Sequence, residues 1–237
     1  MTPAVLCLHG AGAGGWEWNV WRAVFEAAGL ATAAPDLQPA APGLARTTLD
    51  DYAAQARAAL RALPRPRVLV GASLGGLLAA MCADDADALV LVNPLPPAPW
   101  HAELPSRDWP AIVPWRREAR LASTRRALPD ADEAAALYAF DRWRDESGLV
   151  LRTAHAGVTL ERPVCPLLCM ASAVDDDVPP AITAALAAAW DADVLRLPAT
   201  SHVGPLLGRG AAAAARQALA WCRDRRGLPA ASRHASE

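Results

Sequence analysis

Short apolar runs alternate along this chain with longer alanine-rich stretches. The apolar runs are typical of buried strands, and the alanine-rich stretches are typical of helices. A chain that alternates in this way folds into a mostly parallel sheet with helices on both faces. The sequence therefore predicts an α/β fold with about six strands, near residues 4–9, 30–34, 67–70, 88–92, 166–171 and 193–197. The predicted helices fall near residues 16–28, 48–63, 74–84, 179–190 and 209–225.

One predicted strand-to-helix turn has the pattern Gly-x-Ser-x-Gly, formed by Gly71, Ser73 and Gly75. In this pattern the serine occupies a cramped turn, and the flanking glycines remove Cβ atoms that would clash, so the serine side chain points into solvent. The turn also opens a helix, so the backbone N–H of Leu74 is left without a helical partner and can donate to a developing oxyanion. A small-residue turn of this kind is also a common structural device. The strand before it and the helix after it favour the interpretation of Ser73 as a nucleophile.

Near the start of the chain, residues 5–12 run from an apolar strand into a His-Gly loop. Together with the turn at Ser73, this loop resembles the α/β-hydrolase family. In that family the loop after this strand donates a second oxyanion N–H from the residue that follows the His-Gly pair, which implies Ala11 here. We expect His9 to hold the loop in shape and not to transfer protons.

The same resemblance implies a catalytic acid after the predicted strand at residues 166–171. Three consecutive aspartates follow that strand and precede a Val-Pro pair. The family carries its acid three residues before such a pair, which selects Asp175 and leaves Asp176 as the alternative. Asp177 is expected to cap the helix that begins near the proline.

The resemblance also implies that His202 is the catalytic base, because it follows the predicted strand at residues 193–197 and a loop of small residues. The other histidines do not fit this place, because they precede the acid or lie in the C-terminal tail. Ser73, Asp175 and His202 then occur in the order Ser, Asp, His, which is the chain order of α/β-hydrolases.

Residues 98–160 interrupt the alternation of strands and helices, and in the family a cap is inserted at this place. We therefore expect an α/β-hydrolase core at residues 1–97 and 161–226 and a helical cap at residues 98–160. The small, polar and aperiodic residues 227–237 predict a disordered tail.

Residues 15–18, Gly-Trp-Glu-Trp, echo a tryptophan-containing stretch of the compact branch of the family that includes plant methylesterases and hydroxynitrile lyases. The chain also resembles bacterial carboxylesterases. Candidate substrate contacts are four tryptophans: Trp16, Trp100, Trp115 and Trp143. They would line an apolar pocket beneath the cap, or they would pack the cap onto the core. A cluster of five arginines would select an anionic substrate or, as we expect, would belong to a solvated helix face: Arg116, Arg117, Arg120, Arg125 and Arg126.

The chain contains no lysine, so Schiff-base chemistry is excluded, as is the lysine-dependent mechanism of the similar hydroxynitrile lyases. A net charge of −2 gives no indication of a nucleic-acid partner. The five cysteines fall in predicted strands or helices, so we expect reduced core residues and no metal site. We expect a cytoplasmic protein without a signal peptide or membrane span, because the first strand begins near residue 4 and no apolar run reaches about 18 residues.

These observations predict a serine hydrolase that cleaves an ester of a small, mainly apolar molecule through an acyl-enzyme, without a cofactor. Thioesters, lactones and carbon–carbon bonds are alternative substrates for the same three residues. A ligand-binding protein without catalysis is a further alternative, which the complete Ser, Asp and His set disfavours. The oligomeric state is not indicated by the sequence.

Overall fold

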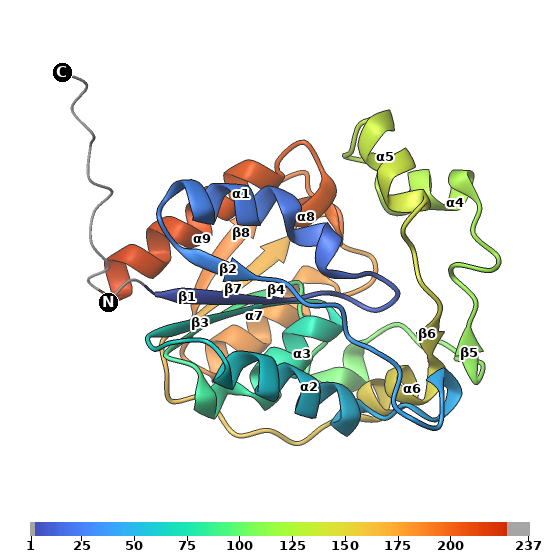
Figure 1. The fold of residues 1–237 in the computed structure, drawn as a ribbon, viewed down its shortest axis with the longest axis horizontal. Coiled ribbons are helices and arrows are strands. Elements are labelled where there is room, and N and C mark those ends of the chain that lie inside the picture. The colour runs from blue at the N-terminus through green and yellow to red at the C-terminus, as the bar shows by residue number, and fades with distance from the viewer. Residues whose placement is uncertain (1–2, 227–237) are drawn as a thin grey trace.

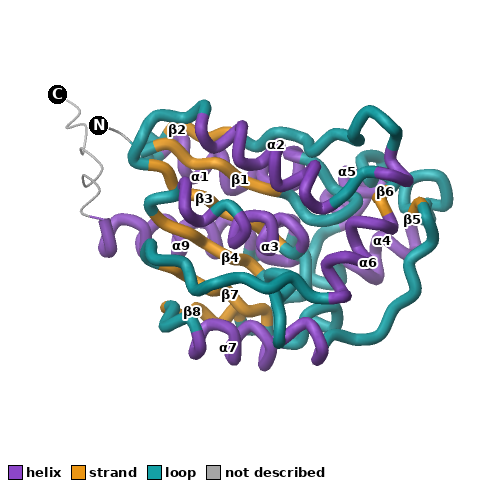
Figure 2. Tube along the Cα trace, turned by 90° about the horizontal axis from the view of Figure 1, so that it is seen from below, coloured by secondary structure: helices purple, strands orange, loops and turns teal. Residues whose placement is uncertain are grey.

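A parallel sheet forms the centre of the computed structural model, which describes residues 3–226 of the 237-residue chain. The predicted tail at residues 227–237 lies outside the described residues. The sheet has six strands in the order β2-β1-β3-β4-β7-β8, all parallel (Figures 1 and 2). Its strands are β1 (Ala4–Leu8), β2 (Ala31–Ala33), β3 (Arg67–Ala72), β4 (Ala88–Val92), β7 (Leu167–Ser172) and β8 (Asp193–Leu197).

Helices cover both faces of the sheet, as Figures 1 and 2 show. One face is covered by α1 (Asn19–Ala27), α8 (Gly204–Leu207) and α9 (Ala211–Arg226), and the other by α2 (Leu49–Arg61), α3 (Leu74–Met81) and α7 (Pro180–Ala189). Successive side chains of a strand point to opposite faces. In β1, Leu6 and Leu8 therefore join the core cluster with α2, α3 and α7, whereas Val5 and Cys7 join the cluster with α1 and α9.

The fold class predicted from the sequence is confirmed, and each predicted strand is present. The predicted helix at residues 16–28 is divided into a 3₁₀ helix (Gly15–Trp18) and α1. Helix α2 begins after Thr48, whose side chain accepts the backbone N–H of Asp51 while the Asp51 carboxylate accepts the backbone N–H of Thr48. This reciprocal pair satisfies two N–H groups at the start of the helix.

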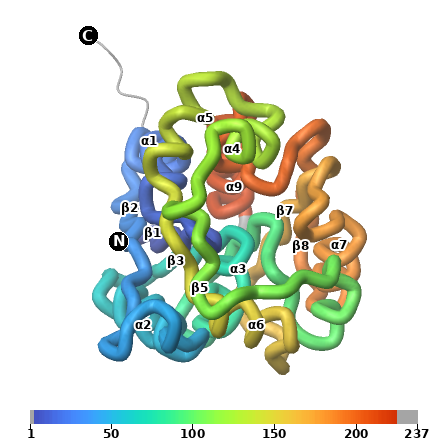
Figure 3. Tube along the Cα trace, turned by 90° about the vertical axis from the view of Figure 1, so that its right-hand side faces the viewer, coloured from blue at the N-terminus to red at the C-terminus, as the bar shows by residue number. Residues whose placement is uncertain are grey.

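An insert between β4 and β7 lies at the end of the sheet where the strands finish (Figure 1). Figure 3 looks from this side and shows α4 and β5 in front of the sheet. The elements of the insert are a 3₁₀ helix (Trp100–Glu103), β5 (Ile112–Val113), α4 (Leu121–Ala127), α5 (Glu133–Phe140), β6 (Glu146–Ser147) and α6 (Gly148–Ala156). Helix α6 buries Val150 and Ala154 in the core cluster below the sheet, so the insert is anchored in the same hydrophobic core. Within residues 3–226, the helices are all too short or too polar to cross a membrane.

Candidate active site

Ser73 lies in the turn between β3 and α3, with φ of 52° and ψ of −119°. A non-glycine residue in such a conformation costs about 1–3 kcal/mol and persists only where its surroundings impose it. The two flanking glycines permit the turn. A Cβ at Gly71 would lie 2.1 Å from the carbonyl oxygen of Gly75, and one at Gly75 would lie 2.1 Å from that of Leu8. The local geometry is therefore that of the strained strand-to-helix turn expected from the sequence.

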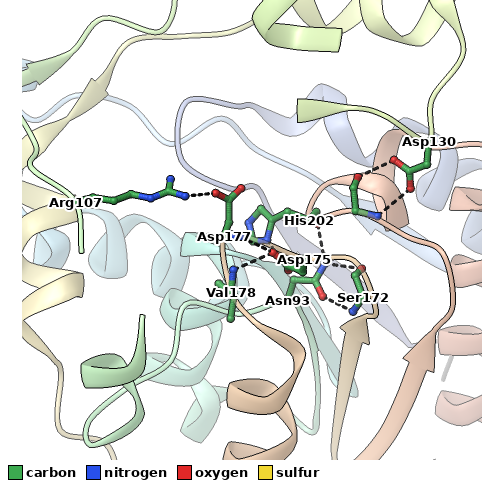
Figure 4. Close-up of polar contacts among 9 residues, drawn as sticks. Asn93, Arg107, Asp130, Ser172, Asp175, Asp177, Val178 and His202 are labelled. Carbon is green, nitrogen blue, oxygen red and sulfur yellow. Dashed lines mark hydrogen bonds and ion pairs between the residues drawn. The ribbon is translucent and has the colours of Figure 1, made fainter. Parts of the chain in front are cut away.

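Asp175 and His202 are joined by a hydrogen bond of 2.8 Å between Oδ2 and Nδ1, as Figure 4 shows. Asp175 lies in the loop after β7, and His202 lies in the loop after β8. The second oxygen of Asp175, Oδ1, accepts the backbone N–H groups of Asp177 and Val178 at 2.9 and 2.8 Å. Asp175 is buried, whereas Asp176 is exposed. The aspartate that contacts His202 is thus Asp175 and not Asp176.

Opposing effects act on the imidazole of His202. Burial, the largest effect, lowers the pKa of His202. The hydrogen bond and negative charge of Asp175, with smaller contributions from Asp177 and Glu17, outweigh burial, so that the pKa of His202 is raised above its usual value. The neutral ring carries its proton on Nδ1, towards Asp175, which leaves Nε2 as the acceptor.

The loop that follows β1 is held by His9. His9 Nε2 accepts the backbone N–H of Leu37 at 2.9 Å, so its proton lies on Nδ1, which donates to the carbonyl oxygen of Gly10 at 2.8 Å. Burial is the main effect that lowers the pKa of His9 to about 4, so the ring is neutral at pH 7. Both ring nitrogens are used in holding the loop, which is the structural role expected from the sequence.

Side chains also fix the N–H groups on either side of Ala11. The N–H of Gly10 donates to Glu17 Oε1 at 2.8 Å, and that of Gly12 donates to Glu146 Oε2 at 3.0 Å. Between residues 3 and 226, no acceptor takes the backbone N–H of Ala11 or of Leu74. Ala11 lies in the wall of the cavity described below, and Leu74 is the residue next to Ser73, which lies in the same wall.

A cavity of about 600 Å³ opens beside these groups, and Ala11, Ser73 and His202 all lie in its wall. This volume falls within the usual range of small-molecule sites, about 300–1,000 Å³. Apolar side chains form most of the remaining wall, among them Leu95, Trp109, Val113, Trp115, Trp143 and Leu151. Besides His202, the ionisable side chains at the wall are Glu17, Arg107, Glu118, Arg120, His155 and Asp177.

The four candidate tryptophans are in different places. Trp115 and Trp143 line the cavity. Trp16 is not at the cavity wall and packs edge-to-face on Trp143, with ring centroids 5.4 Å apart. Trp100 is also absent from the wall and packs on Trp190 at 6.1 Å, against the core. Trp109, which the same aromatic-rich segment supplies, lines the cavity instead.

Two arginines of the candidate cluster also differ. Arg116 Nη1 donates to the carbonyl oxygen of Asp141 at 2.7 Å, and Arg116 does not line the cavity. Arg120 lines the cavity, and no hydrogen bond or ion pair joins its side chain to the rest of the described chain.

Polar contacts tie the insert to the loops that carry the candidate catalytic residues. Asp130, between α4 and α5, accepts the hydroxyl of Ser201 at 2.6 Å and its backbone N–H at 3.1 Å, directly beside His202 (Figure 4). Arg107 pairs with Asp177 on the loop of the acid. Sequence patterns did not indicate these contacts, because the partners lie about 70 residues apart in the chain, 71 for Asp130 and Ser201.

Asn93, at the end of β4, supports the His202 loop from the core side. Its Nδ2 donates to Ser172 Oγ at 2.8 Å and to the carbonyl oxygen of His202 at 2.7 Å, while its Oδ1 accepts the N–H of Ser172 at 2.8 Å (Figure 4). The sequence offered no signal for this role.

In the described part of the chain, the group of side chains that could together hold a metal ion consists of Asp175, Asp177 and His202, with ligand atoms within 4.8 Å of one another. Two of these three, Asp175 and His202, are hydrogen-bonded to each other through the atoms Oδ2 and Nδ1.

The chain matches the alpha/beta hydrolase family over residues 5–216. It is a member of this family. Among solved structures, the pyrethroid hydrolase of Sphingobium faniae JZ-2 is 20% identical, with a TM-score of 0.72 and coverage of 96% of this chain and 99% of that chain. A methylesterase from Arabidopsis is 15% identical, with a TM-score of 0.71 and coverage of 93% and 99%. Tomato methylketone synthase I is 16% identical, with a TM-score of 0.74 and coverage of 95% and 100%.

None of the curated protein sequences matches the chain significantly. At 15–20% identity, the likeness to the solved structures establishes the fold. The resemblance to plant methylesterases that the sequence suggested is confirmed at this level.

Proposed function

We propose that this α/β hydrolase is a serine esterase that cleaves a small, mainly apolar ester through an acyl-enzyme intermediate. The observation that carries the proposal is the hydrogen bond between His202 and Asp175 beside the cavity that His202 shares with Ser73. The order of these residues along the chain is that of the Ser-Asp-His triad of α/β-hydrolases, and the proposal gives them the roles of nucleophile, acid and base. The names of the neighbouring structures, which include a pyrethroid hydrolase and a methylesterase, support hydrolysis as the reaction class.

In the proposed reaction, Ser73 Oγ attacks the ester carbonyl carbon and its proton passes to His202 Nε2. The Ala11 and Leu74 N–H groups donate to the resulting oxyanion, and Asp175 stabilises the imidazolium. The imidazolium then protonates the leaving alcohol as the tetrahedral intermediate collapses. Water attacks the acyl-enzyme and gives a proton to Nε2, and that proton returns to Ser73 Oγ as the carboxylic acid leaves.

The apolar wall of the cavity supports a preference for apolar acyl or alcohol groups. Each buried methylene contributes about 0.8 kcal/mol, so a medium or aromatic acyl group is favoured over acetate by at least several-fold. In this proposal, residues 98–160 act as a cap over the site, with Trp115 and Trp143 in contact with substrate. Trp16 and Trp100 do not enter the proposal, because they are packed away from the cavity wall.

The proposal is tested by measuring hydrolysis of p-nitrophenyl esters of graded acyl length, together with acyl thioesters and lactones, by wild type and Ser73→Ala. Wild type is expected to hydrolyse the esters with the highest kcat/KM, and Ser73→Ala to lose this activity while its thermal melt stays the same. If wild type turns over thioesters or lactones efficiently and esters only weakly, the function is thioester or lactone hydrolysis and not ester hydrolysis. Equal ester activity of the two proteins would refute the role of Ser73.

A further inference from the structure

Glu17 is a buried carboxyl group in the wall of the proposed active site. It lies on the 3₁₀ helix Gly15–Trp18, between Trp16 and the core residue Trp18, and it is 2% exposed. Its Oε1 accepts the N–H of Gly10, one residue before the proposed oxyanion donor Ala11. Glu17 also shares the cavity wall with Ser73 and His202.

The second carboxyl oxygen of Glu17, Oε2, has no hydrogen-bond partner in the part of the chain that the structure describes. Across residues 3–226, no backbone or side-chain group donates a hydrogen bond to Oε2, and no arginine forms an ion pair with Glu17. Oε2 is not one of the enclosed polar atoms that lack a partner, and Glu17 lies in the cavity wall, so Oε2 is open to the cavity. Water can form a hydrogen bond with it there, and a bound molecule that displaces this water can take its place.

The protonation state of Glu17 decides which kind of partner it takes. Burial raises the pKa of Glu17 to about 8, although the hydrogen bond from Gly10 and the charge of His202 oppose this effect. Cys7 of β1 also interacts with Glu17, and burial keeps its thiol neutral by raising its pKa. Glu17 is thus mainly a neutral acid at pH 7. Since Oε1 accepts the Gly10 N–H, the proton lies on Oε2, towards the cavity.

We propose that Glu17 is a substrate-binding residue, whose Oε2 hydroxyl donates a hydrogen bond to an acceptor oxygen that lies close to the scissile bond of the ester. This inference rests on the proposed esterase function and narrows its substrate class. The preferred substrates are esters whose acyl group carries an ether, hydroxyl or carbonyl oxygen near the ester carbonyl, within an otherwise apolar molecule. A neutral carboxylic acid held in an apolar site is an effective hydrogen-bond donor of this kind.

A matched pair of esters tests the inference. p-Nitrophenyl methoxyacetate and p-nitrophenyl butanoate differ by one ether oxygen in place of one methylene, and the ratio of their kcat/KM values is compared between proteins, so that their intrinsic reactivities cancel. In Glu17→Met, which keeps the length of the side chain but has no donor, the ratio is expected to fall about tenfold relative to wild type. A general disturbance of the Gly10 loop would lower both rates and leave the ratio in place.

Glu17→Gln separates the donor from the charge. Its amide can still accept from Gly10 and donate to substrate, but it does not titrate. In wild type the preference for methoxyacetate is expected to decline as the pH rises through about 8, because Glu17 loses its proton. In Glu17→Gln the preference is expected to persist to higher pH. The matched control is Glu26→Gln, because Glu26 is an exposed glutamate on α1. Its preference for methoxyacetate is expected to depend on pH as in wild type.

The two proposals fail in different ways. If wild type hydrolyses neither of these esters nor any other p-nitrophenyl ester of the graded series, the esterase function is refuted. If wild type hydrolyses both esters but the ratio is the same in Glu17→Met, or the preference of wild type is unchanged well above pH 8, Glu17 does not bind substrate as a donor. A fall in the ratio for Glu17→Met with retention in Glu17→Gln supports the inference.

Discussion

Replacing Asp175 by asparagine tests whether Asp175 orients the base. Asp175 Oδ1 accepts two backbone N–H groups, from Asp177 and Val178, at 2.9 and 2.8 Å. The amide of the introduced asparagine side chain would keep its oxygen in this position, because its NH₂ group cannot accept those bonds. The NH₂ group would then face His202 Nδ1. Because an NH₂ group can only donate, Nδ1 would have to lose its proton and accept the hydrogen bond. The proton of the neutral imidazole would move to Nε2, and the ring could no longer accept a proton from Ser73.

The structure therefore predicts a large loss of kcat without a loss of folding. The corresponding tautomer error in serine proteases lowers kcat by about 10⁴-fold, and a similar factor is expected for Asp175→Asn. Asp176→Asn is the matched control, because Asp176 is exposed. Its effect is expected to stay within about twofold, as for other surface substitutions. Steady-state hydrolysis of a p-nitrophenyl ester and a thermal melt of each variant provide the measurements.

The pH profile gives a second measure of the same contact. In wild type, kcat/KM is expected to fall as the pH decreases through the raised pKa of His202, because a protonated imidazole cannot act as a base. Loss of the Asp175 carboxylate removes the two largest interactions that raise this pKa, so the acidic limb moves to lower pH in the variant. A variant with near wild-type kcat and an unmoved limb would refute the reasoning, as would a greater loss in Asp176→Asn.

Two further substitutions test the supports of the site. Gly75→Ala places a Cβ 2.1 Å from a carbonyl oxygen of β1, so we expect a loss of about 1–3 kcal/mol in the free energy of unfolding, measured by denaturant titration. Gly210→Ala, which meets nothing within 4 Å, is the control, and equal stabilities of the two variants would contradict the packing argument. Asp130→Ala removes both hydrogen bonds to Ser201, so kcat is expected to fall about tenfold with little change in KM, because His202 is held less firmly. An unchanged kcat would show that this contact does not position the base.

Local patterns predicted the sheet and the strand-to-helix turn well. The four central strands are short, buried and mainly apolar segments, and the conformation of Ser73 depends on glycines that are its close neighbours in the chain. The spacing to the Val-Pro pair favoured Asp175 but left Asp176 as an alternative. It depends on which carboxylate is buried and accepts two backbone N–H groups, which only the folded loop determines.

The wall of the cavity was less predictable. Whether a tryptophan of the insert faces the cavity or the core depends on packing between segments far apart in sequence, and Trp109 lines the cavity while Trp100 packs on Trp190. The place of Glu17 in the cavity wall could not be predicted from its neighbours in the chain, because a glutamate between two tryptophans resembles an exposed residue of an amphipathic segment. Its burial follows from the tertiary contact with Gly10.

The central claim, that Ser73 is the nucleophile of a triad, is tested most directly by locating a covalent adduct. Wild type is treated with a fluorophosphonate, digested and examined by mass spectrometry. We predict one adduct, on Ser73, that is absent from Ser73→Ala and forms far more slowly in His202→Ala, because the serine then lacks its base. An adduct on another residue, or equal rates of labelling in wild type and His202→Ala, would contradict the account.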